Sequence, residues 1–381
     1  MQQIVIIIPT YNEAEVIEKT VREIFREAAK IFNKTIQILI FDSASTDGTQ
    51  QKIIQLQQTY QHLHLKTESQ KSGLGSAYLQ AMRYTLDELN ADVIIEFDAD
   101  LSHQPQYLSA MLEQLKTCDV VIGSRYISGG SIPKDWGVKR KLLSVLGNYT
   151  ARFILSFKYK DWTSGFRASR TSILSQVLPT HFLSNQYAYK LHLLWLLHKR
   201  KAKINEYPIV FLDRKIGKSK LPSNSIFDSL RVLCLLRFTE LKTYFKMCVV
   251  GISGITLQFI TFNLLRFYLP VLTATQLGVL IASLNNFILN KQFTFKRHPV
   301  INRMQKLKSF LLFIVYSLLM IYMQGYWLHL VTSYIGQGIL KENLVLLGVT
   351  IITSFINYFT YSNFIWPKIK FKEPLNKRSF I

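Results

Sequence analysis

The chain has 381 residues, is 49% hydrophobic and carries a formal net charge of +22 at pH 7. This basic balance suits a negatively charged partner such as anionic lipid, and the lack of a recognised nucleic-acid motif argues against nucleic acid. Three cysteines, Cys118, Cys234 and Cys248, have neither paired nor metal-ligand spacing. They are expected to be free thiols in a reducing compartment, so a disulfide framework is excluded.

The first part of the chain alternates short apolar runs with helical stretches, as a doubly wound α/β domain does. We predict five buried strands, at 4–8, 36–41, 62–66, 93–97 and 120–123. Because the first strand begins at Ile4, no cleavable signal peptide is expected. Polar residues gather where successive strands end, and ligands of such sheets bind at that carboxyl edge.

Two carboxylates follow the fourth predicted strand, in the tripeptide Asp98-Ala99-Asp100. Hard oxygen ligands at the mouth of a buried strand suit Mg²⁺ or Mn²⁺, which can neutralise the diphosphate of a nucleotide-linked substrate. Alone, Asp-x-Asp is weak evidence, because acidic pairs also cap helices and line solvated turns. We predict a metal site here, with a structural role as the alternative.

Other residues at the same edge suit a nucleotide sugar. Tyr11 and Glu13, with Asp42 one strand away, can hold a base by stacking and by hydrogen bonds to its edge and ribose. The alternative for Asp42 is an Asx-turn or a helix cap. Gly73 and Gly75 allow close backbone approach, although an ordinary turn explains them equally well.

Three arginines, Arg125, Arg140 and Arg214, carry guanidinium forks suited to phosphate oxygens. Taken alone, each is more simply explained as a solvated surface charge.

Residues 4–221 resemble the inverting, GT-A-fold glycosyltransferases of family 2, and among them the dolichyl- or polyprenyl-phosphate mannose and glucose synthases. The resemblance rests on eight strings in order: 9–13 (PTYNE), 45–49 (STDGT), 73–75 (GLG), 98–105 (DADLSHQP), 123–126 (GSRY) with 129–130 (GG), Trp136 with Arg140 and Ser144, 161–167 (DWTSGFR) and 213–220 (DRKIGKSK). One such string could occur by chance, but eight in order could not.

The resemblance implies roles for individual residues. By this resemblance, the acceptor phosphate is bound by Arg125, Arg140 and Ser144, and the donor diphosphate is bound by Arg214. The metal is bound by Asp98, Asp100 and Ser102. The catalytic set is then Asp100, Arg125, Arg140, Ser144 and Arg214. The residues implied to bind the nucleotide-sugar donor are Pro9, Tyr11, Glu13, Asp42, Gly75, Asp98, Ala99, Asp100, Arg214 and Lys220.

Three positions depart from the family pattern. Ser43 stands where a second acidic residue is common, and Ser102 stands where a glutamine supplies a third metal contact. The metal is then expected to rely more on water and diphosphate oxygens, which Mg²⁺ tolerates. His192 stands where glutamate is usual, and it is a base, a switch or an unremarkable helix residue.

The second half of the chain predicts a membrane protein. Residues 222–246 form a linker, with 225–246 a basic amphipathic helix in the membrane interface or, alternatively, one packed on the soluble domain. Four apolar spans follow, at 247–269, 271–290, 310–331 and 344–366. The predicted domains are therefore 1–221, 222–246, 247–367 and a basic tail at 368–381.

Lysine and arginine concentrate before the first span, between the second and third, and after the fourth, so the catalytic domain and both termini should be cytoplasmic. Asparagines and aromatics recur in register at 286–295 and 357–366, which indicates two related helical hairpins or simply aromatic belts. Residues 246–367 resemble the GtrA-like four-helix membrane domain.

The sequence therefore predicts an α/β GT-A transferase that moves a hexose, mannose first and glucose second, from GDP-mannose or UDP-glucose to polyprenyl phosphate. Two alternatives remain open. One is a catalytically degenerate protein that binds or flips the lipid-linked sugar, with Ser102 and His192 as relics of lost catalysis. The other is a family 2 transferase with a different acceptor.

Overall fold

The structure, a computed structural model, describes residues 1–213, 224–294, 303–336 and 338–360. By internal contacts the chain divides into two compact units. Of the described residues, the first unit comprises those up to Phe238, and the second comprises those from Thr239 onward. The division falls inside the linker predicted from the sequence. Each unit is described by itself.

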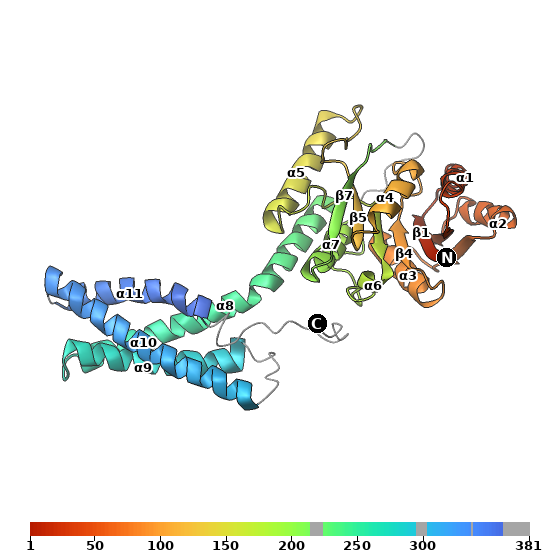
Figure 1. The fold of residues 1–381 in the computed structure, drawn as a ribbon. Coiled ribbons are helices and arrows are strands. Elements are labelled where there is room, and N and C mark those ends of the chain that lie inside the picture. The colour runs from red at the N-terminus through yellow and green to blue at the C-terminus, as the bar shows by residue number, and fades with distance from the viewer. Residues whose placement is uncertain (214–223, 295–302, 337, 361–381) are drawn as a thin grey trace. The chain divides into compact units, whose positions relative to one another are not determined.

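A seven-stranded mixed sheet forms the centre of the first unit, in the order β3-β2-β1-β4-β6-β5-β7 (Figure 1). All neighbouring strands are parallel except β6, which runs antiparallel to β4 and β5. The strands are β1 (Gln2–Thr10), β2 (Lys34–Asp42), β3 (Leu63–Thr67), β4 (Val93–Glu96), β5 (Val120–Ser124), β6 (Arg167–Arg170) and β7 (Ile204–Pro208).

The five predicted strands are confirmed, and the expected doubly wound arrangement needs one correction. Strand β6 has no apolar run, which is why sequence patterning did not predict it. It stays buried because its first residue, Arg167, forms a bidentate ion pair with Glu96 of β4 at 2.6 and 2.9 Å. The hydroxyl of Tyr189 donates a further hydrogen bond of 3.0 Å to Glu96.

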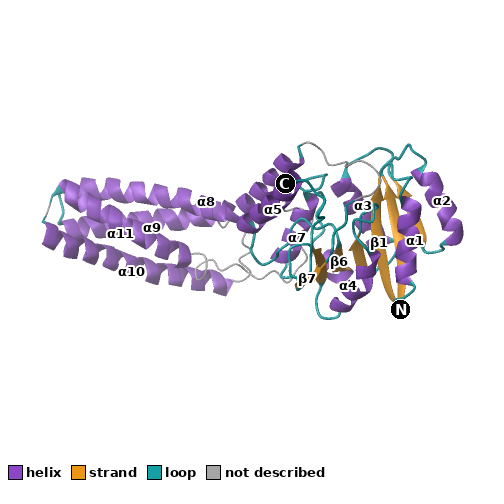
Figure 2. Cartoon of the chain, turned by 90° about the horizontal axis from the view of Figure 1, so that it is seen from above, coloured by secondary structure: helices purple, strands orange, loops and turns teal. Residues whose placement is uncertain are grey.

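Helices cover both faces of the sheet (Figure 2). Alternation along β1 divides its side chains, so that Ile4, Ile6 and Ile8 pack against one helical layer and Val5 and Ile7 against the other. The first layer contains α1 (Ile17–Ala28), α2 (Thr49–Thr59) and α4 (Leu108–Gln114), and the second contains α3 (Leu74–Asp87), α6 (Thr171–Leu174) and α7 (Tyr189–Lys199). The remaining elements here are a 3₁₀ turn, Pro105–Tyr107, and α5 (Val138–Ile154).

The predicted amphipathic segment is the start of a single helix, α8 (Ser225–Leu265). Val232, Leu233 and Leu236 are buried in the same core as α3 and α7. For Leu233 and Leu236 the alternative interpretation, packing on the soluble domain, is therefore correct, and membrane contact is not, because protein already covers these side chains. Ile226 and Phe227 on the same helix are exposed.

The second unit continues with α9 (Val271–Leu289), a π-helical turn at Asn290–Thr294, α10 (Arg303–Ile335) and α11 (Ile339–Thr360). Within the described residues, three helices are long and apolar enough to cross a membrane, at Phe245–Leu265, Val271–Thr294 and Phe310–Ile335. They match the first three predicted spans. The fourth predicted span, like the second repeat at 357–366, extends beyond the described residues, which end at Thr360.

Polar side chains bind one another inside the second unit. Gln258 of α8 donates a hydrogen bond of 2.8 Å to Gln324 of α10, and Arg266 pairs with the buried Glu342 at 2.8 Å. Such interhelical pairs satisfy groups that a hydrocarbon environment would leave unsolvated.

Candidate active site

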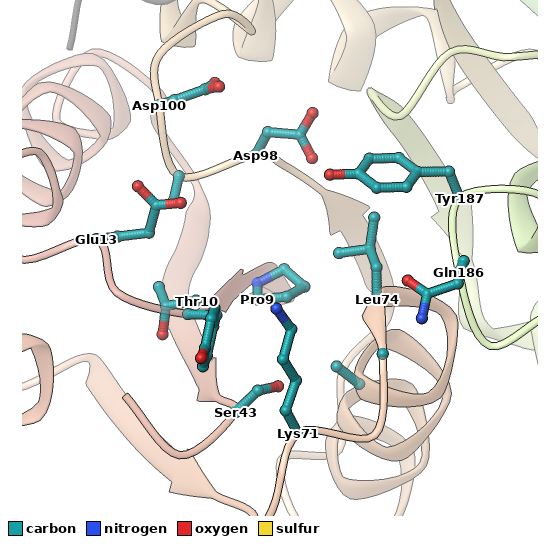
Figure 3. Close-up of a pocket in the computed structure, with 14 residues that line it drawn as sticks. Pro9, Thr10, Glu13, Ser43, Lys71, Leu74, Asp98, Asp100, Gln186 and Tyr187 are labelled. Atoms are coloured by element: carbon teal, nitrogen blue, oxygen red, sulfur yellow. The ribbon is translucent and has the colours of Figure 1, made fainter. Parts of the chain in front are cut away.

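The carboxyl ends of β1, β2 and β4 surround a cavity of about 200 Å³ in the first unit. In Figure 3 the Asp98 carboxylate faces the hydroxyl of Tyr187, with Asp100 and Glu13 to one side and Lys71 at the opposite edge. The cavity is lined by Pro9, Thr10, Tyr11, Glu13, Ser43, Lys71, Gly73, Leu74, Ala77, Asp98, Ala99, Asp100, Gln186 and Tyr187. Most of the predicted donor set is thus brought together.

The three loops that follow these strands share an unusual backbone conformation. The backbone φ angles of Asn12, Ala44 and Leu101 are 53°, 56° and 58°. These values lie in the left-handed region, which residues other than glycine usually avoid. Residues in this conformation cluster at ligand sites, where the surrounding structure holds the strain. Each of these three loops therefore contains one residue in this conformation, close to residues that line the cavity.

Two of the three predicted metal ligands, Asp98 and Asp100, line this cavity. The backbone N–H of Asp98 donates to Nδ1 of His103 at 3.2 Å, and His103 Nε2 lies 3.6 Å from the Asp98 carboxylate. The backbone N–H of Ser102 donates to Asp100 at 3.0 Å, but Ser102 itself is buried outside the cavity lining.

Tyr11 and Glu13, predicted to hold the nucleotide, both line the cavity. The ammonium of Lys71 lies 3.5 Å from the centre of the Tyr11 ring. Asp42 is fully buried and is not part of the lining. Its carboxylate accepts hydrogen bonds from the side chains of Thr10, Ser45 and Gln50 and from the backbone N–H of Ser45. The residue thus has a structural role, as its alternative interpretation expected, although it does not cap the helix that follows, whose N-cap is Gly48.

The glycine pair packs against another segment of the chain. A Cβ atom at Gly73, whose φ is +100°, would lie 2.4 Å from the carbonyl oxygen of Asn185. Gly75 lies outside the lining, and its backbone N–H donates to that same carbonyl at 2.8 Å. The close approach therefore positions Gln186 and Tyr187 at the cavity.

Arg125 lies at the end of β5 and is held by the protein. Its guanidinium donates to both carboxylate oxygens of Asp161, at 2.7 and 2.8 Å, and to Thr163 at 2.7 Å. Burial alone would lower the pKa of Arg125, but the charge and hydrogen bonds of Asp161, with smaller effects of Tyr126 and Asp98, raise it. Arg125 is thus a permanent cation, and the Asp98 carboxylate is one of the negative charges that stabilise its charged form.

Arg140 and Ser144 occupy successive turns of α5. Arg140 lies over the Trp136 ring at 4.0 Å and pairs with Asp213 through two hydrogen bonds, at 2.9 and 3.1 Å. Ser144 exchanges a hydrogen bond of 2.7 Å with the hydroxyl of Tyr126. The predicted acceptor residues therefore form a cluster separate from the donor cavity lining. Arg214 and Lys220 lie outside the described residues.

Comparison with known proteins finds a matching family for each half of the chain. Residues 5–178 match the family Glycosyl transferase family 2, and residues 246–366 match the GtrA/DPMS transmembrane domain. Undecaprenyl-phosphate mannosyltransferase of Micrococcus luteus is 33% identical over 227 residues, covering 60% of this chain and 90% of that protein.

The chain belongs to glycosyl transferase family 2.

Two further relatives of this glycosyltransferase extend the comparison. Polyprenol monophosphomannose synthase of Mycolicibacterium smegmatis is 32% identical, over 60% of this chain and 84% of that protein. Dolichol-phosphate mannosyltransferase of Pyrococcus furiosus is 30% identical, over 79% of this chain and 84% of that protein, so its match reaches into the membrane domain.

In this glycosyltransferase the fit to a divalent cation rests on two carboxylates. Among the described residues, no three His, Cys, Asp or Glu side chains come together to hold a metal ion. Asp98 and Asp100 nevertheless present hard oxygen atoms to one cavity. They fit Mg²⁺ or Mn²⁺ with water and diphosphate oxygens as its remaining ligands.

Sequence reasoning missed Lys71 and Gln186 as cavity residues. Both come from loops with no recognisable pattern, although Lys71 stands two residues before the Gly73 motif and Gln186 directly precedes the Tyr187 segment. Proximity to those motifs is the only signal by which either residue could have been found.

His192 is a core residue of this glycosyltransferase. Its Nδ1 accepts a hydrogen bond of 3.1 Å from the backbone N–H of Leu183, and its ring packs edge-on against Phe182. Burial lowers the pKa of His192 to about 4. Of the three roles considered for His192, the structure favours the unremarkable helix residue, because the ring is neutral and outside the cavity lining.

Proposed function

We propose that this glycosyltransferase transfers a hexose, mannose first and glucose second, from a nucleotide diphosphate sugar to polyprenyl phosphate with inversion at the anomeric carbon. The relatives named above as mannosyltransferases or a phosphomannose synthase of polyprenyl lipids support both the sugar and the acceptor. GDP-mannose is accordingly the first donor to test and UDP-glucose the second.

One structural observation, on helix α5, supports the proposal that the acceptor is a lipid phosphate. On α5, Arg140 and Ser144 turn toward Asp213 and Tyr126, while Leu142, Leu146 and Phe153 are 55%, 52% and 73% exposed. A single helix thus combines groups suited to a phosphate with an open apolar stripe. A phosphate at the end of a hydrocarbon chain matches both properties.

The chemistry needs positioning and charge compensation more than a protein base. An acceptor phosphate is already ionised at neutral pH, so its oxygen attacks the anomeric carbon as the bond to the leaving diphosphate breaks. Arg125 and Arg140 would aim this phosphate, and Arg214 would assist the leaving group. Mg²⁺ or Mn²⁺ held by Asp98 and Asp100 would supply further positive charge to the diphosphate.

Charge distribution supports placing this reaction at the cytoplasmic membrane face. The lysines and arginines concentrate in segments that would all be cytoplasmic if both termini were, which follows the positive-inside rule. The exposed stripe of α5 would then meet the lipid surface from which the acceptor comes.

The test is direct. Membranes containing the protein are incubated with radiolabelled GDP-mannose or UDP-glucose, with and without polyprenyl phosphate. We expect label in a lipid fraction only when polyprenyl phosphate is present, with mannose preferred. Label that enters a different acceptor, or a protein that binds donor without turnover, would favour one of the two alternative functions.

A further inference from the structure

Lys190 is a buried cation next to the donor cavity. It lies in the first turn of α7, is 8% exposed, and follows the cavity residue Tyr187, whose ring centre is 5.6 Å from its ammonium. Within the part of the chain that the structure describes, this ammonium makes neither an ion pair nor a hydrogen bond. None of the roles assigned above uses it.

Contacts place the ammonium between the donor cavity and the acceptor cluster. A Cβ atom at Gly165 would lie 2.3 Å from Nζ of Lys190 and 3.2 Å from Cε1 of His103. Gly165 belongs to the loop that also supplies Asp161, the partner of Arg125. The loop therefore passes directly against Lys190 and His103.

The contacts of His103 give the same placement. Its Nε2 lies 3.6 Å from the carboxylate of the predicted metal ligand Asp98. Lys190 and the predicted metal ligand therefore lie on either side of one buried histidine ring.

Among the described residues, the Lys190 ammonium has no carboxylate partner in the ligand-free protein. The first turn of a helix also carries a positive partial charge, which repels a cation. An anion that enters the site would offset this repulsion. Phosphate groups are the anions that the proposed reaction brings here.

We propose that the Lys190 ammonium binds a phosphate oxygen in the transfer site, belonging to either the donor diphosphate or the acceptor phosphate. This inference rests on the proposed function. During transfer, two anionic groups approach the same anomeric carbon, and a fixed cation between them lowers their repulsion. The step needs no proton transfer to or from Lys190, because the acceptor oxygen forms its new bond to the anomeric carbon as the electron pair of the old bond leaves with the diphosphate.

The test uses the full-length protein in detergent and compares Lys190→Met with Lys190→Arg. Lys199→Met is the matched control, since Lys199 is an exposed lysine of the same helix. We expect Lys190→Met to weaken GDP and UDP binding, or to raise the KM for polyprenyl phosphate, by about tenfold or more. Lys190→Arg should recover part of the loss, and the control should match the wild type.

The two measurements, diphosphate binding and acceptor KM, distinguish between the donor diphosphate and the acceptor phosphate as the ligand of Lys190. Weaker GDP or UDP binding assigns Lys190 to the donor diphosphate, and a raised acceptor KM with unchanged diphosphate binding assigns it to the acceptor. Unchanged binding and kinetics in Lys190→Met would overturn the inference. If the wild type binds GDP or UDP but transfers no sugar to polyprenyl phosphate, the proposed function fails, and the binding arm still decides the role of Lys190.

Thermal unfolding distinguishes this role from a structural one. The gain in Tm on adding GDP or UDP should be smaller for Lys190→Met than for the wild type if the donor diphosphate is the ligand. A lower ligand-free Tm combined with an unchanged gain would show that the ammonium only stabilises the fold, and would count against an anion site.

Discussion

Asp98 and Asp100 line the cavity and are oriented by contacts with neighbouring residues. His103 receives the Asp98 backbone N–H, and the left-handed conformation of Leu101 turns the chain so that Ser102 donates to Asp100. The carboxylates are therefore oriented before any ligand arrives. Preorganisation of this kind is what electrostatic stabilisation of a leaving diphosphate requires.

Asp100→Asn removes one full charge at nearly constant size. We expect loss of sugar transfer and weaker metal-dependent binding of nucleoside diphosphate, while the Tm stays close to that of the wild type. EDTA should stop transfer by the wild type in the same way. Asp87→Asn, at an exposed position of α3, is the control. Wild-type activity in Asp100→Asn would contradict the metal assignment.

The pH dependence of stability should reveal His192. Burial lowers its pKa from 6.5 to about 4, so the folded state prefers the neutral ring and is fully stabilised only above pH 6.5. Stability is then lost as the pH falls toward 4, by about 3 kcal/mol for this residue. His192→Gln should flatten the decline of Tm over this window. An unchanged decline would show that His192 does not titrate as inferred.

Residues within motifs could be predicted from the sequence, and isolated ones could not. Asp98, Tyr11 and Glu13 sit directly after apolar runs, so their place at the sheet edge follows from strand pairing. Lys71 reaches the cavity, and Lys190 comes next to its Tyr187, through the tertiary packing of loops and of α7 on the sheet. No local pattern encodes such contacts.

At the scale of elements, strand prediction succeeded where side chains were uniformly apolar. Strand β6 (Arg167–Arg170) is polar in sequence, and its burial depends on the distant Glu96. Strand β7 (Ile204–Pro208) is an edge strand that is mostly half-buried, so it also lacks a strong pattern. Helix α8 differs from these strands, because the sequence did predict it from its amphipathic pattern. The pattern did not show, however, that part of the apolar face packs on protein.

Helix α5 is the element whose exposed stripe most affects the proposed function. Replacing Leu142 and Leu146 together by serine removes apolar surface but leaves Arg140 and Ser144 in place. We expect a higher KM for polyprenyl phosphate in bilayers and unchanged donor binding, because the stripe is inferred to meet the lipid surface. Ile54→Ser, at an exposed apolar residue of α2, is the control. Equal acceptor kinetics in the double variant and the control would remove this role for α5.

At the scale of the whole molecule, α8 joins a catalytic unit to a membrane unit. The helix contributes Val232, Leu233 and Leu236 to the core of the first unit and continues to Leu265 as the first candidate span. The boundary between the units at Phe238 and Thr239 therefore lies within a helix, where no loop or composition change marks it. The border predicted after Leu221 would separate the catalytic unit from three of its core residues.

Truncation tests this division directly. A protein ending at Lys246 keeps the three core residues of α8, so we expect it to fold, bind nucleoside diphosphate and transfer sugar to short, detergent-dispersed polyprenyl phosphate. A protein ending at Leu221 should be less stable by several kcal/mol, at about 1.5–3 kcal/mol for each large side chain that is no longer buried. Tm values and transfer rates of the two proteins measure the difference. If the longer protein folds and binds donor but transfers nothing to the short acceptor, the membrane unit must supply part of the active site, because anchoring alone would leave that reaction intact.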